Sequence, residues 1–82
     1  MELKDTIPMM DNADYKERFK AEYYQLKIRL EKLNAMLAKW DIGELDFKPT
    51  CPRSIYSLQT KYMYEYMAIL EARAQIEGIE LQ

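Results

Sequence analysis

The segment that decides the fold runs from Phe19 to Trp40 and reads FKAEYYQLKIRLEKLNAMLAKW. Its main apolar residues recur at alternating steps of four and three, at Phe19, Tyr23, Leu26, Leu30, Leu33, Leu37 and Trp40. This spacing puts one apolar stripe along an α-helix, and it is typical of a helix that packs lengthwise against a partner helix. The segment therefore predicts a long amphipathic helix with a helical partner.

The borders of this helix carry capping signals. Asp14 is followed three residues later by Glu17, which is the pattern of a capping box at a helix start. The stretch Asp41-Ile42-Gly43 indicates a helix end. Two prolines in the next ten residues forbid a regular continuation. We therefore predict the first helix over residues 14–41 and a connection over residues 42–53.

A second helix is predicted over residues 54–77, with Thr50 or Ser54 as its capping residue. At about 100° per residue, its apolar side chains cover nearly half of its circumference, which is wider than the stripe that one partner helix needs. The second helix is therefore expected to contact the first helix and one further surface. These apolar residues are Ile55, Tyr56, Leu58, Tyr62, Met63, Tyr66, Met67, Ile69, Leu70, Ala74 and Ile76.

The first helix also carries a second apolar row opposite its main stripe, and two helices alone offer no layer to cover it. We predict an all-α chain with a single domain over residues 1–82, built as an antiparallel two-helix hairpin that assembles into a homo-oligomer. A short leader over residues 1–13 and a tail over residues 78–82 complete it, and the leader is the alternative cover for the second apolar face. The residues expected at the interface between copies are Tyr24, Ile28, Met63, Met67 and Leu70.

One charged residue falls inside the apolar arc of the second helix. This residue is Arg73, and an unpaired buried charge there is costly. If Trp40 and Ser54 flank the turn of an antiparallel pair, Glu22 lies level with Arg73. We predict a Glu22–Arg73 ion pair that fixes the register of the hairpin, with an arginine that faces a ligand as the alternative.

The composition excludes several classes of active site. The chain has no histidine, one cysteine and two glycines, which excludes His-based catalysis, a multi-thiolate zinc site and a glycine-rich phosphate loop. Cys51 has no histidine to activate it, and its role stays open. We therefore expect no enzyme activity, no catalytic residue, no metal and no cofactor.

Charge and hydropathy exclude further partners and locations. A net charge of −2 argues against a duplex-DNA binder, which needs a basic face. No apolar run reaches the roughly 20 residues that span a bilayer, and the start of the chain lacks the pattern of a secretory signal. A single cysteine is compatible with a reducing compartment. The sequence therefore predicts a cytoplasmic location without membrane contact.

Two basic and aromatic groups are the candidate ligand sites, because helix N-termini attract anions and tyrosine rings stack on bases. Tyr15, Lys16 and Arg18 stand at the start of the first helix, and Arg53 and Tyr56 at the start of the second. Solvated surface charge is the alternative interpretation of both groups. The chain has seven tyrosines. The tyrosines expected on the core side are Tyr15, Tyr23, Tyr62 and Tyr66.

Both helices carry motifs that resemble a known group. The first reads Tyr15-x-x-Arg18-Phe19-x-x-Glu22-x-x-x-Leu26 with Arg29-Leu30-x-x-Leu33, and the second reads Leu58-Gln59-x-x-x-Met63-x-x-Tyr66-x-x-x-Leu70-x-x-Arg73. Over residues 14–76 the chain resembles the small helical-hairpin proteins of phages and prophages that are related to a crAss-like phage protein. Its architecture, with the stretch 57–63, is also similar to the hairpin domains of phage cyclic-nucleotide sponges that counter CBASS and Thoeris defence.

These resemblances imply a function. We expect a non-enzymatic phage or prophage accessory protein in the cytoplasm of an infected bacterial host, which counters defence by sequestering a cyclic oligonucleotide signal. The expected partners are further copies of the chain and that signal. The alternative is a protein-interaction module, either an inhibitor that docks on a host defence protein or a structural assembly unit.

Overall fold

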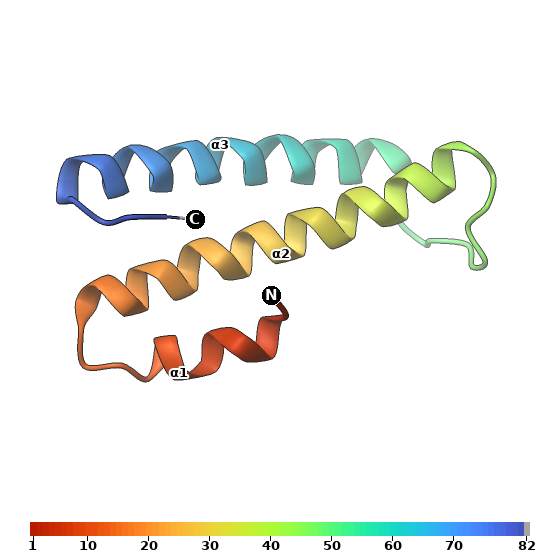
Figure 1. Cartoon of the computed structure of the whole chain (residues 1–82). Coiled ribbons are helices and arrows are strands. Elements are labelled where there is room, and N and C mark those ends of the chain that lie inside the picture. Colours follow the sequence, from red (N-terminus) through yellow and green to blue (C-terminus); the bar gives the residue numbers. More distant parts are fainter. Residues whose placement is uncertain (82) are drawn as a thin grey trace.

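The computed structural model describes residues 1–81, and every regular element in that range is helical. A short 3-10 helix η1 (Leu3–Thr6) leads into α1 (Ile7–Met10), and two long helices follow, α2 (Tyr15–Asp41) and α3 (Arg53–Glu77). Figure 1 shows α2 and α3 side by side and running in opposite directions, with η1 and α1 on the other side of α2. The predicted all-α class is confirmed.

Asp14 and Gly43 mark the ends of α2 as the sequence indicates, but the Glu17 half of the predicted capping box does not form, because the backbone N–H of Asp14 donates to the Asn12 side-chain oxygen at 2.8 Å. The Asp14 carboxylate accepts a hydrogen bond from the backbone N–H of Lys16 at 3.0 Å, which satisfies one of the free donors of the first turn. At the other end Gly43 adopts φ 76°, a left-handed conformation that glycine takes at low cost. The N–H of Glu44 then bonds back to the carbonyl of Lys39 at 2.8 Å, which closes the last turn.

The start of α3 differs from both predicted caps. The residue at its N-cap is Pro52, and no side chain caps the first turn. Neither Thr50 nor Ser54 therefore has the capping role that the sequence suggested for it. Proline suits this place because its fixed φ of −61° leads the chain into the helix.

The leader is itself helical, and it covers the second apolar row of α2. Both η1 and α1 pack against α2 (Figure 1). Thr6 is 1% exposed, and its hydroxyl accepts a hydrogen bond from the side-chain amide of Gln25 at 2.9 Å. Tyr24 and Ile28 are buried on this side of α2. The leader was the alternative cover for this face, and in the structure it takes that place.

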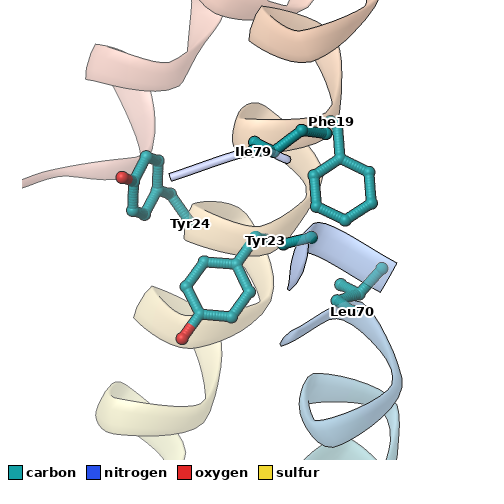
Figure 2. Packing of buried hydrophobic residues seen from close by; sticks show 6 residues of the cluster. Phe19, Tyr23, Tyr24, Leu70 and Ile79 are labelled. Atoms are coloured by element: carbon teal, nitrogen blue, oxygen red, sulfur yellow. The ribbon is translucent and has the colours of Figure 1, made fainter. Parts of the chain in front are cut away.

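The main core lies where the first half of α2 meets the second half of α3. Leu70 is 0% exposed there, and full burial of a leucine contributes about 1.5–3 kcal/mol. The Tyr23 hydroxyl donates to the Glu71 carboxylate at 3.3 Å, and burial together with that negative charge raises the pKa of Tyr23. Figure 2 shows the side chains that pack at this point. The buried members are Phe19, Tyr23, Tyr24, Leu70, Ala74 and Ile79.

The tail closes this core from the end of α3. Gly78 adopts φ 69°, and the N–H of Ile79 bonds to the carbonyl of Ala74 at 2.8 Å. This Schellman-type turn sends the chain back toward α2, as Figure 1 shows, and buries the Ile79 side chain against the cluster. Leu81 packs against the same cluster.

Candidate functional site

The cluster predicted at the start of α2 is largely used within the chain. The Arg18 guanidinium donates to the backbone carbonyls of Asn12 and Ala13 at 2.9 and 2.8 Å. It therefore holds the turn between α1 and α2. Lys16 is exposed and its side chain has no bond among the contacts of residues 1–81. Of the two predicted cations, only Lys16 is left for a ligand.

Arg73 is bound by aromatic and acidic neighbours other than Glu22. Its guanidinium donates to the Tyr15 hydroxyl at 2.7 Å and to the Glu77 carboxylate at 3.4 Å, and it lies over the Phe19 ring at 4.9 Å from the centroid. These contacts link the start of α2 to the end of α3. They also make Tyr15 part of the hairpin contact rather than a free stacking surface.

Glu22 also has another partner. Its carboxylate accepts a hydrogen bond from the Tyr66 hydroxyl, so the predicted Glu22–Arg73 pair does not form. The predicted register is nevertheless close to the observed one. Tyr23, one residue after Glu22, bonds Glu71, two residues before Arg73. The prediction was therefore wrong about the partner of Glu22 and not about the register. The Tyr66 side chain is long enough to reach the Glu22 carboxylate across the helix pair.

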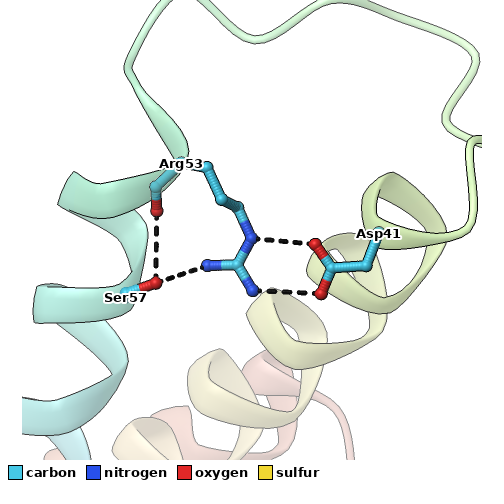
Figure 3. Close-up of polar contacts among 3 residues, drawn as sticks. All are labelled: Asp41, Arg53 and Ser57. Atoms are coloured by element: carbon cyan, nitrogen blue, oxygen red, sulfur yellow. Dashed lines mark hydrogen bonds and ion pairs between the residues drawn. The ribbon is translucent and has the colours of Figure 1, made fainter.

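The turn end of the hairpin is fixed by an ion pair with two contacts. The Arg53 Nε and Nη2 donate to the two Asp41 oxygens at 3.1 and 3.2 Å, and Nη1 donates to the Ser57 hydroxyl at 2.8 Å (Figure 3). Hydrogen bonding to Arg53 lowers the pKa of Asp41. Tyr56 packs its ring edgewise on Trp40, with centroids 5.8 Å apart. The residues predicted to bind a ligand here therefore stabilise the turn.

The two predicted clusters cannot form one site within a single chain. They stand at opposite ends of α2, which is 27 residues long. At about 1.5 Å per residue, roughly 40 Å separates the ends. A ligand that contacts both clusters would need two copies of the chain.

The residues predicted at the oligomer interface are wholly or partly buried within the chain. Tyr24, Ile28 and Leu70 are buried, and Met63 and Met67 are half-buried. Tyr24 and Ile28 lie on the side of α2 where the leader packs, while Leu70 and Met67 belong to the main core. Tyr24, Ile28 and Leu70 are therefore covered within the chain, while Met63 and Met67 keep part of their side chains at the surface, and their role in an interface stays a prediction.

The outer face of α3 is apolar and exposed, in line with the apolar arc that the sequence predicts to be wider than one partner helix can cover. The predicted interface residues, however, were placed on Met63, Met67 and Leu70 and not on this face. Of the helices in residues 1–81, only α2 packs against α3. Tyr62 and Tyr66, expected in the core, are exposed, and Ile69 and Ile76 are 58% and 84% exposed. The signal was present in the sequence, since Ile55, Tyr62, Ile69 and Ile76 recur every seven residues. We use the name outer α3 face for Ile55, Leu58, Tyr62, Tyr66, Ile69 and Ile76.

Two surface grooves lie along α2. The first, of about 180 Å³, lies beside the start of the chain and is lined by Met1, Tyr24, Lys27, Ile28 and Glu31. The second, of about 300 Å³, lies between the second half of α2 and the connection, and we call it the connection groove. It is lined by Lys32, Ala35, Met36, Lys39, Leu45, Asp46 and Phe47.

Three further features bear on a metal site, a membrane span and a reactive thiol. Within residues 1–81 no three Asp, Glu, Cys or His side chains are grouped to hold a metal ion. None of the helices in that range is long and apolar enough to cross a membrane. Cys51 is an exposed free thiol in the connection.

Comparison with known proteins adds a family. The model of the Sequestin family matches residues 13–76, which span α2, the connection and nearly all of α3. The chain belongs to the Sequestin family. No curated protein and no solved structure matches the chain. The family name indicates a sequestering, binding role, and it fits the resemblance to phage proteins that sequester a ligand. The closer relation to a crAss-like phage protein stays a prediction.

The Asp41–Arg53 ion pair predicts a pH dependence of stability. Because the pKa of Asp41 is lowered in the folded chain, the pair stabilises the fold above the unfolded pKa of about 3.9 and loses this effect as the pH falls through the lower folded pKa. We expect Asp41→Asn to melt below the wild type at pH 7, with a difference that shrinks in acid. Thermal melts followed by circular dichroism, from pH 7 to about pH 2.5, measure this difference in melting temperature.

The control for this experiment is Glu44→Gln, which removes one carboxylate of the same connection. Glu44 is exposed and has no ion pair among residues 1–81. A difference between wild type and Asp41→Asn that stays constant across the pH range would contradict the role of the pair.

Proposed function

We propose that this protein sequesters a cyclic oligonucleotide immune signal in the cytoplasm of a bacterium infected by a phage, and that it does so by binding without cleavage. The observation that carries the proposal is the Sequestin match over residues 13–76, which covers both long helices. The resemblance of these helices to phage cyclic-nucleotide sponges supports the nature of the ligand. A phage or prophage origin belongs to the same proposal.

Sequestration places simple physical demands on a small chain. The protein needs a dissociation constant below the concentration of the signal, together with enough copies to hold it. A dissociation constant of about 1 µM corresponds to a binding free energy of about −8 kcal/mol. Stacking of bases on aromatic rings and ion pairs with phosphates supply energy of this kind without a catalytic group.

We also propose that the chain forms a homo-oligomer through the outer α3 face. Monomeric proteins rarely expose an apolar face that runs the length of a helix. A repeat of seven residues is the pattern with which helices pack side by side, and β-branched isoleucine fills three of its four places on α3. The one arginine near this row, Arg73, is already paired with Glu77. The face is therefore close to neutral, and a second copy of itself is a suitable partner.

The same face supports the alternative function. An inhibitor that docks on a host defence protein also needs an exposed apolar helix face, and Tyr62 and Tyr66 are residues of the kind that anchor such contacts. The two functions differ in what they predict for the isolated chain. A sponge binds a cyclic nucleotide on its own, while a protein-interaction module does not.

Ligand binding is tested first by thermal stability. Because a ligand of the folded state stabilises it by mass action, cyclic di-AMP, cyclic GMP–AMP or cyclic tri-AMP at 100 times its dissociation constant should add about 2.7 kcal/mol and raise the melting temperature. Differential scanning fluorimetry over this panel measures the shift. A well-folded sample that shifts with none of the three would contradict the sequestering function and favour the docking alternative.

Assembly is tested by molar mass. The chain has a mass of 9.9 kDa, and we expect size-exclusion chromatography with light scattering to give at least twice that value. Ile69→Glu places a charge in the middle of the outer α3 face and should yield the monomer. Ala68→Glu is the matched control, because Ala68 is the residue before Ile69 and is exposed but lies outside that face. A wild-type monomer at all concentrations would refute the proposed interface.

A further inference from the structure

The connection groove carries side chains that suit a nucleotide. Part of its lining is apolar, with Ala35 and Met36 from α2 and Leu45 from the connection. Its volume of about 300 Å³ is at the lower end of the range for small-molecule sites. No residue of α3 lines it, so assembly through the outer α3 face leaves the groove in place.

Phe47 supplies an aromatic surface at this groove. Its side chain is 56% exposed although it is fully apolar, and it has no ring partner among residues 1–81. The exposed tyrosines instead have polar or charged partners, and the Lys61 ammonium lies 5.5 Å from the centroid of the Tyr62 ring. Tyr15 bonds Arg73, and Tyr64 accepts a hydrogen bond from Asn34. An exposed ring without a partner, in a groove with apolar lining, is an arrangement on which a nucleobase stacks.

Two lysines give the groove its positive charge. Lys32 and Lys39 are seven residues apart on α2, so they lie on one face of the helix and about 10.5 Å apart along its axis. Lys39 has no ion pair in the described part of the chain. Lys32 has only an exposed pair with Glu2 at 3.7 Å, and such surface pairs contribute little. Both ammonium groups are therefore available to phosphate.

Asp46 adds a single acceptor to the same groove. Its carboxylate is exposed and lines the groove with Phe47. An ionised carboxylate only accepts hydrogen bonds, so it suits the amino group on the edge of a base and repels a phosphate. The groove thus offers different contacts for the base and for the phosphate of one nucleotide.

We propose that the connection groove binds one nucleotide unit of the sequestered ligand, and this assignment rests on the proposed function. The base stacks on Phe47 with its amino group toward Asp46, and the phosphate binds Lys32 and Lys39. Both clusters predicted from the sequence are less suited, because Arg18 and Arg53 are bonded within the chain. The first groove is less suited as well, since its Lys27 stands four residues from Glu31 and its Tyr24 ring is buried.

The test is an NMR titration of the ¹⁵N-labelled full chain with cyclic di-AMP, cyclic GMP–AMP and cyclic tri-AMP, and in a separate arm with 5′-AMP. We expect the largest amide shifts at Lys32, Lys39 and residues 45–47. Phe47→Ala should weaken binding about tenfold or more, as expected for the loss of one stacked base. Lys39→Ala should weaken it by several-fold, and more at low salt.

Matched variants separate these effects from general ones. Lys48→Ala removes the same charge next to the groove, and Ile42→Ala removes an exposed apolar side chain of the same connection. Neither residue lines the groove, and both variants should bind like the wild type. If Lys48→Ala weakened binding as much as Lys39→Ala, the effect would be one of net charge and the groove assignment would fall.

The outcomes distinguish the groove from the proposed function. Shifts with a cyclic nucleotide that centre on Lys16 or Tyr56 would overturn the groove and leave sequestration standing. Shifts at the groove with 5′-AMP alone would support the groove and overturn the cyclic ligand. If neither kind of nucleotide shifts any amide, the groove and the cyclic ligand are both refuted.

Discussion

The structure depends on the contact between the first half of α2 and the second half of α3. Leu70 is fully buried there, and Phe19, Tyr23 and Ile79 surround it. The leader and the tail both pack onto this end, so α2 is covered on two sides while α3 is covered on one. The exposed outer α3 face follows directly from this asymmetry. Within residues 1–81 no helix other than α2 packs against α3, which leaves this face open in the structure.

Much of the fold was readable from the sequence because it depends on backbone signals and periodicity. The alternating stripe from Phe19 to Trp40 predicted α2, and Gly43 and Gly78 marked helix ends with positive φ in the structure. The leader was not predicted as a helix. Proline is well tolerated in the first turn of a helix, and Pro8 stands there in α1. Which of two apolar faces the leader covers is decided by tertiary packing, and local pattern does not contain that information.

The candidate site was less predictable, because side-chain partners depend on reach and not only on register. Glu22 and Arg73 were placed nearly level, but Tyr66 and Tyr15 bind them in the structure. Arg18 and Arg53 looked like ligand groups in sequence and turned out to stabilise turns. The connection groove combines α2 residues with Phe47, which comes after the end of that helix. The path of the connection brings these residues together, so no motif in the sequence predicts the groove.

Sequestration without cleavage means that this Sequestin-family chain holds its ligand intact. Isothermal titration with cyclic di-AMP, cyclic GMP–AMP and cyclic tri-AMP, followed by denaturation of the complex and chromatography of the released nucleotide, tests it most directly. We expect saturable binding of at least one of these ligands and its full recovery as the unmodified cyclic nucleotide. Absence of binding to all three, or recovery of a linear product after binding, would contradict it.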